Sequence, residues 1–236
     1  MGGLYALVAW GGLRIFGPAG PRVFPSARGV LAQLEFNGNV LDSSGNGRHG
    51  VLLGGEFRRT EWGEGLSVQG GTPGGQGMAP PFVKVPPMGV DWSAHAHLIT
   101  IPYTIELVIT PNETRSYAKI FGSSDARDEG LYYQGGRIMV YPHASAGDGK
   151  LAPGEHHYIA VVASTPGKLD VYLQGKHAVQ APSNLSPPLS EAIFFRDDAQ
   201  TRRGEQLDGI VEALRISSVA RTPAEIAAVQ RRLESR

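Results

Sequence analysis

Residues 42–50, which read Asp-Ser-Ser-Gly-Asn-Gly-Arg-His-Gly, are the stretch that most constrains how this chain can fold. Gly45 and Gly47 can take a positive φ without a steric penalty, and Asp42 and Asn46 have short polar side chains that bond readily to nearby backbone groups. Apolar runs lie on both sides of the stretch. It therefore predicts a structured corner between two strands.

Patterns of apolar residues predict strands along most of the chain. Residues 103–110 give the clearest alternation, because Tyr103, Ile105, Leu107 and Ile109 fall on one face of an extended segment. The opposite face would carry Thr104, Glu106 and Thr110. Further strands are predicted at residues 30–36, 49–53, 66–69, 82–85, 118–121, 130–133, 137–141, 155–163 and 168–173.

The composition agrees with many short strands joined by turns, since 32 of the 236 residues are Gly and 17 are Pro. The 22 basic and 22 acidic residues cancel, and no long run of like charge occurs. These features argue against a nucleic-acid partner. The chain has no Cys, so disulfides and thiolate chemistry are excluded.

The N-terminal residues are predicted to lie outside the main domain. Residues 4–15 are apolar and Gly-rich, but they are too short to span a membrane and no basic segment precedes them, so neither a membrane span nor a convincing signal peptide is predicted. We expect residues 1–28 to form an arm that packs on the domain or on a neighbouring molecule, and residues 29–236 to form one domain.

Four segments together resemble the laminin G-like jellyroll domains of the concanavalin A-like lectin/glucanase superfamily. They are the corner at 42–50, the Gly-rich entry at 61–70, the hairpin at 155–176 and the closing strand at 208–217. The resemblance implies an all-β, antiparallel two-sheet jellyroll β-sandwich with a short C-terminal helix. The chain departs from the family pattern at Gln174 and Glu212, where Asp is usual, and at Ala213, where Glu is usual.

The C-terminal helix is also predicted from local signals. Thr222 suits the N-cap, Pro223 suits the first helical position, and Glu225 completes a capping box. The apolar residues that follow form one stripe, which should dock on the sandwich: Ile226, Val229 and Leu233.

The same superfamily contains glucanases, in which one strand carries Glu-x-Asp-x-x-Glu. No Glu in this chain has an Asp two positions later, so that active site cannot be assembled in the same way. No Gly-x-Ser-x-Gly elbow and no phosphate-binding loop occur either. We therefore expect a protein that is not an enzyme, with a glycoside hydrolase as the lesser alternative.

Metal binding has one candidate site. Asp42 and Asn46 could supply oxygen ligands to Ca²⁺, which accepts mixtures of carboxylate, amide and backbone oxygens. The alternative is that both side chains only close the turn. The pairs His95/His97 and His156/His157 are interpreted as structural or solvent-facing, and no other cofactor is predicted.

Binding is the function that remains. Aromatic rings pack against the apolar faces of sugars, while Arg and carboxylates bond to the hydroxyls. The available residues are Trp92, Tyr132, Tyr133, Tyr141, Arg202 and Arg203, although each Tyr could instead fill the core. We expect an extracellular or surface-associated recognition or adhesion module for a glycan or protein ligand. The alternative is a structural subunit of an appendage or virion, in which the N-terminal arm drives self-association.

Overall fold

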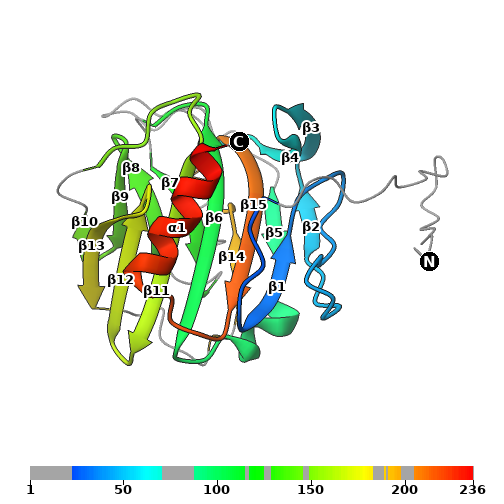
Figure 1. Cartoon of the computed structure of the whole chain (residues 1–236). Helices are drawn as coiled ribbons and strands as arrows, with labels where there is room; N and C mark the ends of the chain where they lie inside the picture. Colours follow the sequence, from blue (N-terminus) through cyan, green and yellow to red (C-terminus); the bar gives the residue numbers. More distant parts are fainter. Residues whose placement is uncertain are drawn as a thin grey trace.

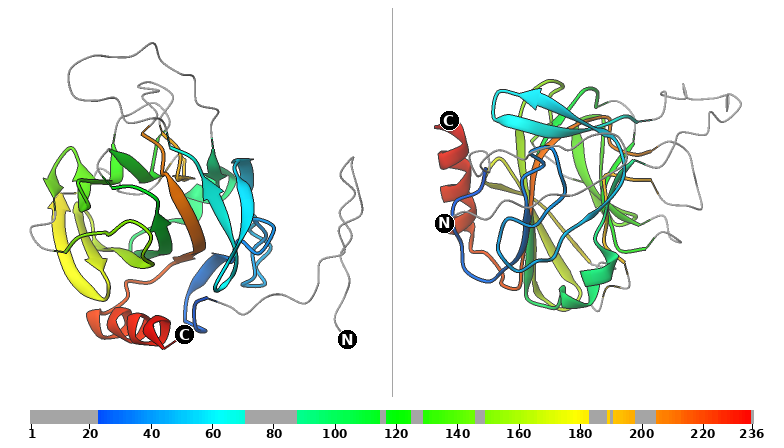
Figure 2. Two further views of the ribbon diagram at one scale, coloured as in Figure 1. Left: turned by 90° about the horizontal axis from the view of Figure 1, so that it is seen from above. Right: turned by 90° about the vertical axis from the view of Figure 1, so that its right-hand side faces the viewer.

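The computed structural model describes residues 23–70, 88–114, 117–124, 129–145, 149–182, 189, 191–197 and 205–235. These residues form two antiparallel sheets stacked face to face, with one α-helix on the outside of one sheet (Figures 1 and 2). The predicted strand at 82–85 and the loop residues Arg202 and Arg203 lie outside the described residues. The all-β sandwich with a short C-terminal helix is confirmed.

Sheet A has eight strands and carries the helix. The order is β13 (Lys176–Pro182), β12 (Lys168–Leu173), β11 (His157–Thr165), β6 (Tyr103–Pro111), β15 (Gly209–Ser217), β4 (Gly63–Val68) and β3 (Glu56–Thr60), and β1 (Val30–Leu34) also pairs with β15. All of these pairings are antiparallel.

Sheet B has seven shorter strands. The order is β10 (Ala144–Ser145), β9 (Arg137–Tyr141), β8 (Gly130–Gln134), β7 (Ala118–Gly122), β14 (Ile193–Phe194), β5 (Gly89–Asp91) and β2 (Val51–Gly54). A short 3₁₀ helix, η1 (Ser93–Leu98), follows β5. The sequence did not predict β5, β10 or β14, because each has only two or three residues and so shows no periodicity.

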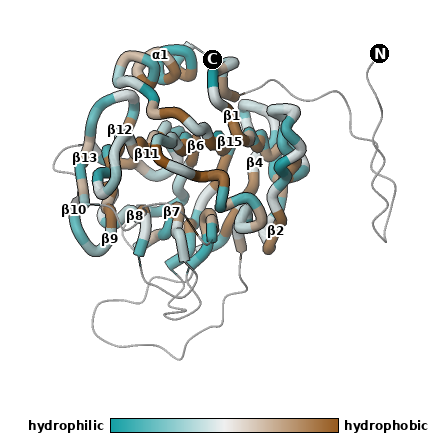
Figure 3. Tube along the Cα trace, turned by 90° about the horizontal axis from the view of Figure 1, so that it is seen from below, coloured by the Kyte–Doolittle hydropathy of each residue, from teal (hydrophilic) through white to brown (hydrophobic). Residues whose placement is uncertain are grey.

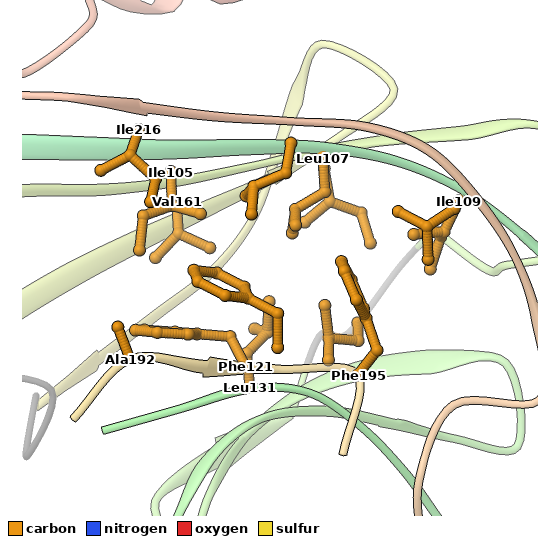
Figure 4. Close-up of a cluster of buried hydrophobic side chains, with 14 of the residues drawn as sticks. Ile105, Leu107, Ile109, Phe121, Leu131, Val161, Ala192, Phe195 and Ile216 are labelled. Atoms are coloured by element: carbon orange, nitrogen blue, oxygen red, sulfur yellow. The ribbon is translucent and has the colours of Figure 1, made fainter. Parts of the chain in front are cut away.

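The core lies between the two sheets. Ile105, Leu107 and Ile109 of β6 point toward aromatic and aliphatic side chains of sheet B, including Phe121 and Phe195 (Figure 4). All five side chains have no exposed surface. The alternation predicted for residues 103–110 is therefore confirmed on its apolar face.

Helix α1 (Pro223–Glu234) covers the outer face of sheet A (Figure 1). The predicted capping box is present, because Glu225 N donates to the Thr222 hydroxyl and the Glu225 carboxylate accepts from Thr222 N. The predicted stripe of Ile226, Val229 and Leu233 is buried in a second apolar cluster outside sheet A. In Figure 3, hydrophobic and hydrophilic residues alternate along the tube of α1.

The polar face of β6 is also buried, which the sequence did not predict. Thr104 and Glu106 have no exposed surface, because α1 and the segment that begins at Val23 cover this side of sheet A. Tyr158 donates from its hydroxyl to Glu106 at 2.6 Å. The second face of β6 thus lies under another layer of the protein at Thr104 and Glu106.

The end of the predicted arm packs on its own domain. Val23 and Phe24 are buried in the second cluster, and Val23 N donates to the Glu35 carboxylate at 2.8 Å. The Phe24 ring lies 4.6 Å from the Arg215 guanidinium, in cation–π contact. Residues 1–22 lie outside the described residues, so self-association through the arm stays a prediction. Within the described part of the chain, neither helix is long and apolar enough to cross a bilayer.

Candidate functional site

The outer faces of the two sheets differ in what covers them. On sheet A, α1 and the segment that begins at Val23 occupy the outer surface. On sheet B, no helix of the described residues lies on the outer surface (Figure 2). In the described part of the chain, only sheet A has a helix packed on its outer side chains.

A row of polar and aromatic side chains crosses the outer face of sheet B. Lys119 of β7 lies opposite Tyr132 of β8, which lies opposite Met139 of β9. Their neighbours in each strand point into the core, so these three point outward. The Lys119 Nζ atom lies 5.3 Å from the centre of the Tyr132 ring, a cation–π contact.

Three further residues extend this row. The Tyr141 ring meets the Tyr132 ring edge to face, with centroids 6.0 Å apart. Arg137 is exposed and lies two residues before Met139 on β9. Tyr117 precedes β7 and is 37% exposed, and by strand alternation we expect it on the same side as Lys119. We call this set of six residues the tyrosine face: Tyr117, Lys119, Tyr132, Arg137, Met139 and Tyr141.

The tyrosine face has a buried floor and an exposed rim. Lys119 and Tyr132 are 2% and 1% exposed, so they form the floor. Gly122 makes room for the lysine, because a Cβ at that position would lie 2.7 Å from the Lys119 Cε atom. Arg137 is exposed and Tyr141 is half-buried, so a bound molecule would touch the rim first.

Two other aromatic residues named from the sequence belong to the core. Trp92 is 1% exposed, and its indole N–H donates to the Arg48 carbonyl at 2.9 Å. Tyr133 is fully buried, and its hydroxyl donates to the Glu113 carbonyl at 3.1 Å. Burial raises the pKa of the Tyr133 hydroxyl well above its usual value. Both residues belong to the apolar core between the two sheets, whereas Tyr132 does not, so they are removed from the set of ligand contacts and the core interpretation applies to them.

The corner at residues 42–50 is closed by its own side chains. The Asp42 carboxylate accepts three backbone N–H groups, from Gln33 at 2.9 Å, Ser44 at 2.8 Å and Arg48 at 3.0 Å. The Asn46 side-chain amide donates to the carbonyls at the start of β1. These contacts match the turn-closing alternative.

The same contacts leave a poor donor set for calcium. Burial alone would raise the pKa of Asp42, but the hydrogen bonds from Ser44, Gln33 and Arg48 outweigh it and hold that pKa below its usual value. Among the described residues, no three His, Cys, Asp or Glu side chains come together as metal ligands. Asp42 and Asn46 thus serve to close the turn in this structure, and calcium binding at the corner stays a prediction.

A second polar cluster, which was not predicted, joins the turn between β3 and β4 to the start of β11 and to β15 in sheet A. His156 stacks on Trp62, with ring centroids 4.3 Å apart, and its Nε2 atom lies 2.7 Å from the Glu61 carboxylate. The buried side chain of Glu212 lies beside it. His156 and His157 do fall on opposite faces, as expected: His157 is buried and bonds to Ala152.

The sequence contained one usable signal for the tyrosine face. Lys119 interrupts the apolar run at residues 118–121. A lysine at such a position either faces solvent at the edge of a strand or is a buried cation with a function. Lys119 was not named as a candidate, because nothing in a single sequence shows that Tyr132 packs over it. Tyr132 and Tyr141 were named and do lie together.

A family model described as the concanavalin A-like lectin/glucanases superfamily matches residues 89–227. The matched region runs from β5 into α1 and includes the whole tyrosine face. The chain belongs to this superfamily, and the laminin G-like resemblance is confirmed. No curated protein sequence matches the chain.

Solved structures agree on the fold. Domain 4 of AbnA, a GH43 extracellular arabinanase from Geobacillus stearothermophilus in complex with arabinotriose, has a TM-score of 0.61 and 15% identity, over 86% of this chain and 98% of that one. The binding domain of Paraclostridial Mosquitocidal Protein 1 has a TM-score of 0.60 and 10% identity, over 86% and 52%.

Enzymes also contain this fold. Trypanosoma rangeli sialidase in complex with the inhibitor DANA has a TM-score of 0.58 and 12% identity, over 88% of this chain but only 33% of the sialidase chain. At such identities, the likeness shows the fold alone. The solved structures that share this fold thus include both binding domains and parts of enzymes, and the function must be argued from the site.

Proposed function

We propose that this chain is a noncatalytic glycan-binding module whose ligand lies on the tyrosine face of sheet B. The observation that carries the proposal is the arrangement of Lys119, Tyr132 and Tyr141 on the one sheet whose outer face no described helix covers. Aromatic rings beside a cation and an exposed guanidinium suit a polyhydroxylated ligand, because rings pack on its C–H faces and the charged donors bond its hydroxyls.

The buried acids of sheet A support the noncatalytic part of the proposal. Glu106 is bonded by Arg215 beneath α1, away from sheet B. Glu212 is 1% exposed and lies on sheet A as well. A retaining glycosidase needs two carboxyl groups about 5 Å apart on either side of an accessible glycosidic bond, and neither of these residues is accessible.

The neighbours give the proposal a starting ligand. Domain 4 of the extracellular arabinanase was solved with arabinotriose, and the structures with this fold include the binding domain of Paraclostridial Mosquitocidal Protein 1. We therefore propose a short neutral oligosaccharide, with arabino-oligosaccharides as the first to test, and an extracellular or surface-associated location for the protein.

Site-directed variants test the proposal. A glycan array identifies a binding sugar, and calorimetry then compares the wild type with Tyr141→Ala and Arg137→Ala. Each variant should lose about tenfold in affinity, equal to about 1.4 kcal/mol. His177→Ala is the matched control, because His177 is an exposed ring on sheet A, and it should bind as the wild type does.

Two results would reject the proposal. Unchanged affinity in both rim variants would remove the ligand from the tyrosine face. Release of shorter sugars from the bound glycan during incubation, followed by chromatography, would show that the chain is an enzyme.

A further inference from the structure

Glu212 occupies an irregular point in β15. The pairing of β15 with β6 shifts between Val211 and Ala213, so Glu212 is the extra residue of a β-bulge. The other edge of β15 changes partner at the same place, from β4 at residues 209–211 to β1 at residues 214–217. In Figure 1, β4 lies near the upper end of β15 and β1 near its lower end. A bulge at such a junction can turn a side chain out of the regular alternation.

The carboxylate that results is buried and only half bonded. Its Oε2 atom accepts a hydrogen bond from the Thr60 hydroxyl at 3.0 Å. Its Oε1 atom accepts none from the residues that the structure describes, although Glu212 is only 1% exposed. Oε1 lies 3.9 Å from the Nδ1 atom of His156. A buried acceptor without a donor is costly, and it calls for a physical explanation.

His156 joins Glu212 to the tip of the β3–β4 hairpin. Its Nε2 atom lies 2.7 Å from the Glu61 carboxylate, and its ring stacks on Trp62 at 4.3 Å between centroids. Glu61 and Trp62 are the two residues of the turn between β3 and β4. Its Nδ1 atom lies 2.8 Å from the Thr110 hydroxyl of β6. One imidazole thus ties the hairpin tip to the sheet.

The burial of Glu212 favours uptake of a proton. Burial raises the pKa of Glu212, the Thr60 hydrogen bond and His156 lower it, and Glu61 raises it, with a net rise above the usual value of 4.5. His156 and Glu61 are the titratable groups that face Glu212, while Thr60 and Thr110 contribute only hydroxyls. A proton taken up on Oε1 would remove the negative charge of a buried carboxylate that has a donor on only one of its two oxygens.

We propose that Glu212 and His156 form a proton-operated latch, which fastens the tip of the β3–β4 hairpin to sheet A in weakly acidic solution. At a pH between the usual Glu pKa of 4.5 and the higher pKa of folded Glu212, the folded chain holds a proton that the unfolded chain has released. The stabilisation is fully present below pH 4.5, the usual pKa of Glu. It is lost as the pH rises through the higher pKa that Glu212 has in the folded state. The hairpin tip should accordingly loosen toward neutral and alkaline pH.

Hydrogen exchange of the β3–β4 hairpin, corrected for the intrinsic rate at each pH, tests the latch. In the wild type, residues 56–68 should be better protected at about pH 5 than at about pH 8, while α1 should show no such change. Glu212→Gln carries an amide in place of the carboxylate, so the pH dependence in the hairpin should disappear. Glu56→Gln, at an exposed acid of the same hairpin, should retain it.

His156→Phe provides a second, independent test. This variant keeps a ring to stack on Trp62 but has no nitrogen to share a proton, so the hairpin should be poorly protected at both pH values. Equal protection of the wild-type hairpin at both pH values would overturn the latch. So would a pH dependence that survives in both Glu212→Gln and His156→Phe.

Discussion

Arg215 holds the Glu106 carboxylate through two nitrogen atoms, each 2.7 Å from a carboxylate oxygen, and both side chains are fully buried. Arg221 adds a longer contact at 3.4 Å, and Tyr158 donates from its hydroxyl. Arg215 also donates to the Pro25 carbonyl at 2.7 Å. This one ion pair therefore connects β6, β15 and the segment that leads into β1.

Breaking this pair should destabilise the whole fold. Arg215→Met leaves the Glu106 carboxylate without its main counter-charge, and we expect a loss of about 3–5 kcal/mol in the free energy of unfolding, measured by urea denaturation. The double variant Arg215→Met with Glu106→Leu should recover part of that loss, because the uncompensated Glu106 carboxylate is gone and Arg221 keeps its contact with Glu225 at 3.9 Å. A loss below about 1 kcal/mol in Arg215→Met would contradict the role given to the pair.

Asp42 should stabilise the protein above its own titration range. The pKa of Asp42 in the folded state lies below its usual value of 3.8. The stabilisation by Asp42 is therefore fully present above pH 3.8, and it is lost as the pH falls through the lower pKa of the folded state. Asp42→Asn should therefore lower the melting temperature at neutral pH and change it little in strong acid. Melting curves measured across that range check this, and an equal loss at every pH would contradict it.

The capping box of α1 should contribute a measurable amount. Thr222→Ala removes the acceptor for Glu225 N and should cost about 1 kcal/mol in thermal or chemical unfolding. Thr222→Ser keeps the hydroxyl and should cost much less. The Thr222 backbone N–H and the nearby Arg28 lower the pKa of Glu225 to about 2, so this contribution should fade only in strong acid. Equal losses in the two variants would show that the hydroxyl is not the cause.

Gly122 should matter to binding because it sets the position of Lys119. In Gly122→Ala, the new Cβ would lie 2.7 Å from the Lys119 Cε atom, so the lysine stem must shift and its contact with the Tyr132 ring is disturbed. We expect weaker glycan binding with little loss of stability, since the flexible stem of a lysine moves readily. Calorimetry and thermal melting of the same sample separate the two effects. Full retention of affinity would show that the floor of the tyrosine face is not part of the site.

Local signals predicted the elements whose structure depends on neighbours in the chain. Thr222 and Glu225 lie within one helical turn, and the corner around Asp42 closes on itself, so both could be read directly. The inward face of β6 could be predicted as well, because its alternation is regular. These are the parts of the fold that a single sequence specifies locally.

Contacts between distant segments could not be predicted in the same way. Glu106 looks solvent-facing in the sequence, yet it is buried because α1 and the segment at Val23 return to cover it. Tyr132 and Tyr133 are adjacent and chemically alike, so only the register of β8 shows that Tyr133 points into the core and Tyr132 outward. The bulge at Glu212 likewise depends on which strands flank β15.

The location of the ligand tests the central claim most directly. Backbone amide chemical shifts, followed by NMR during titration with a glycan that binds on the array, report which residues it touches. We predict that the largest changes fall on β7, β8 and β9, around Tyr132 and Tyr141, with α1 unaffected. Changes confined to α1 or to the corner at residues 42–50, or no binding by any glycan tested, would contradict the account.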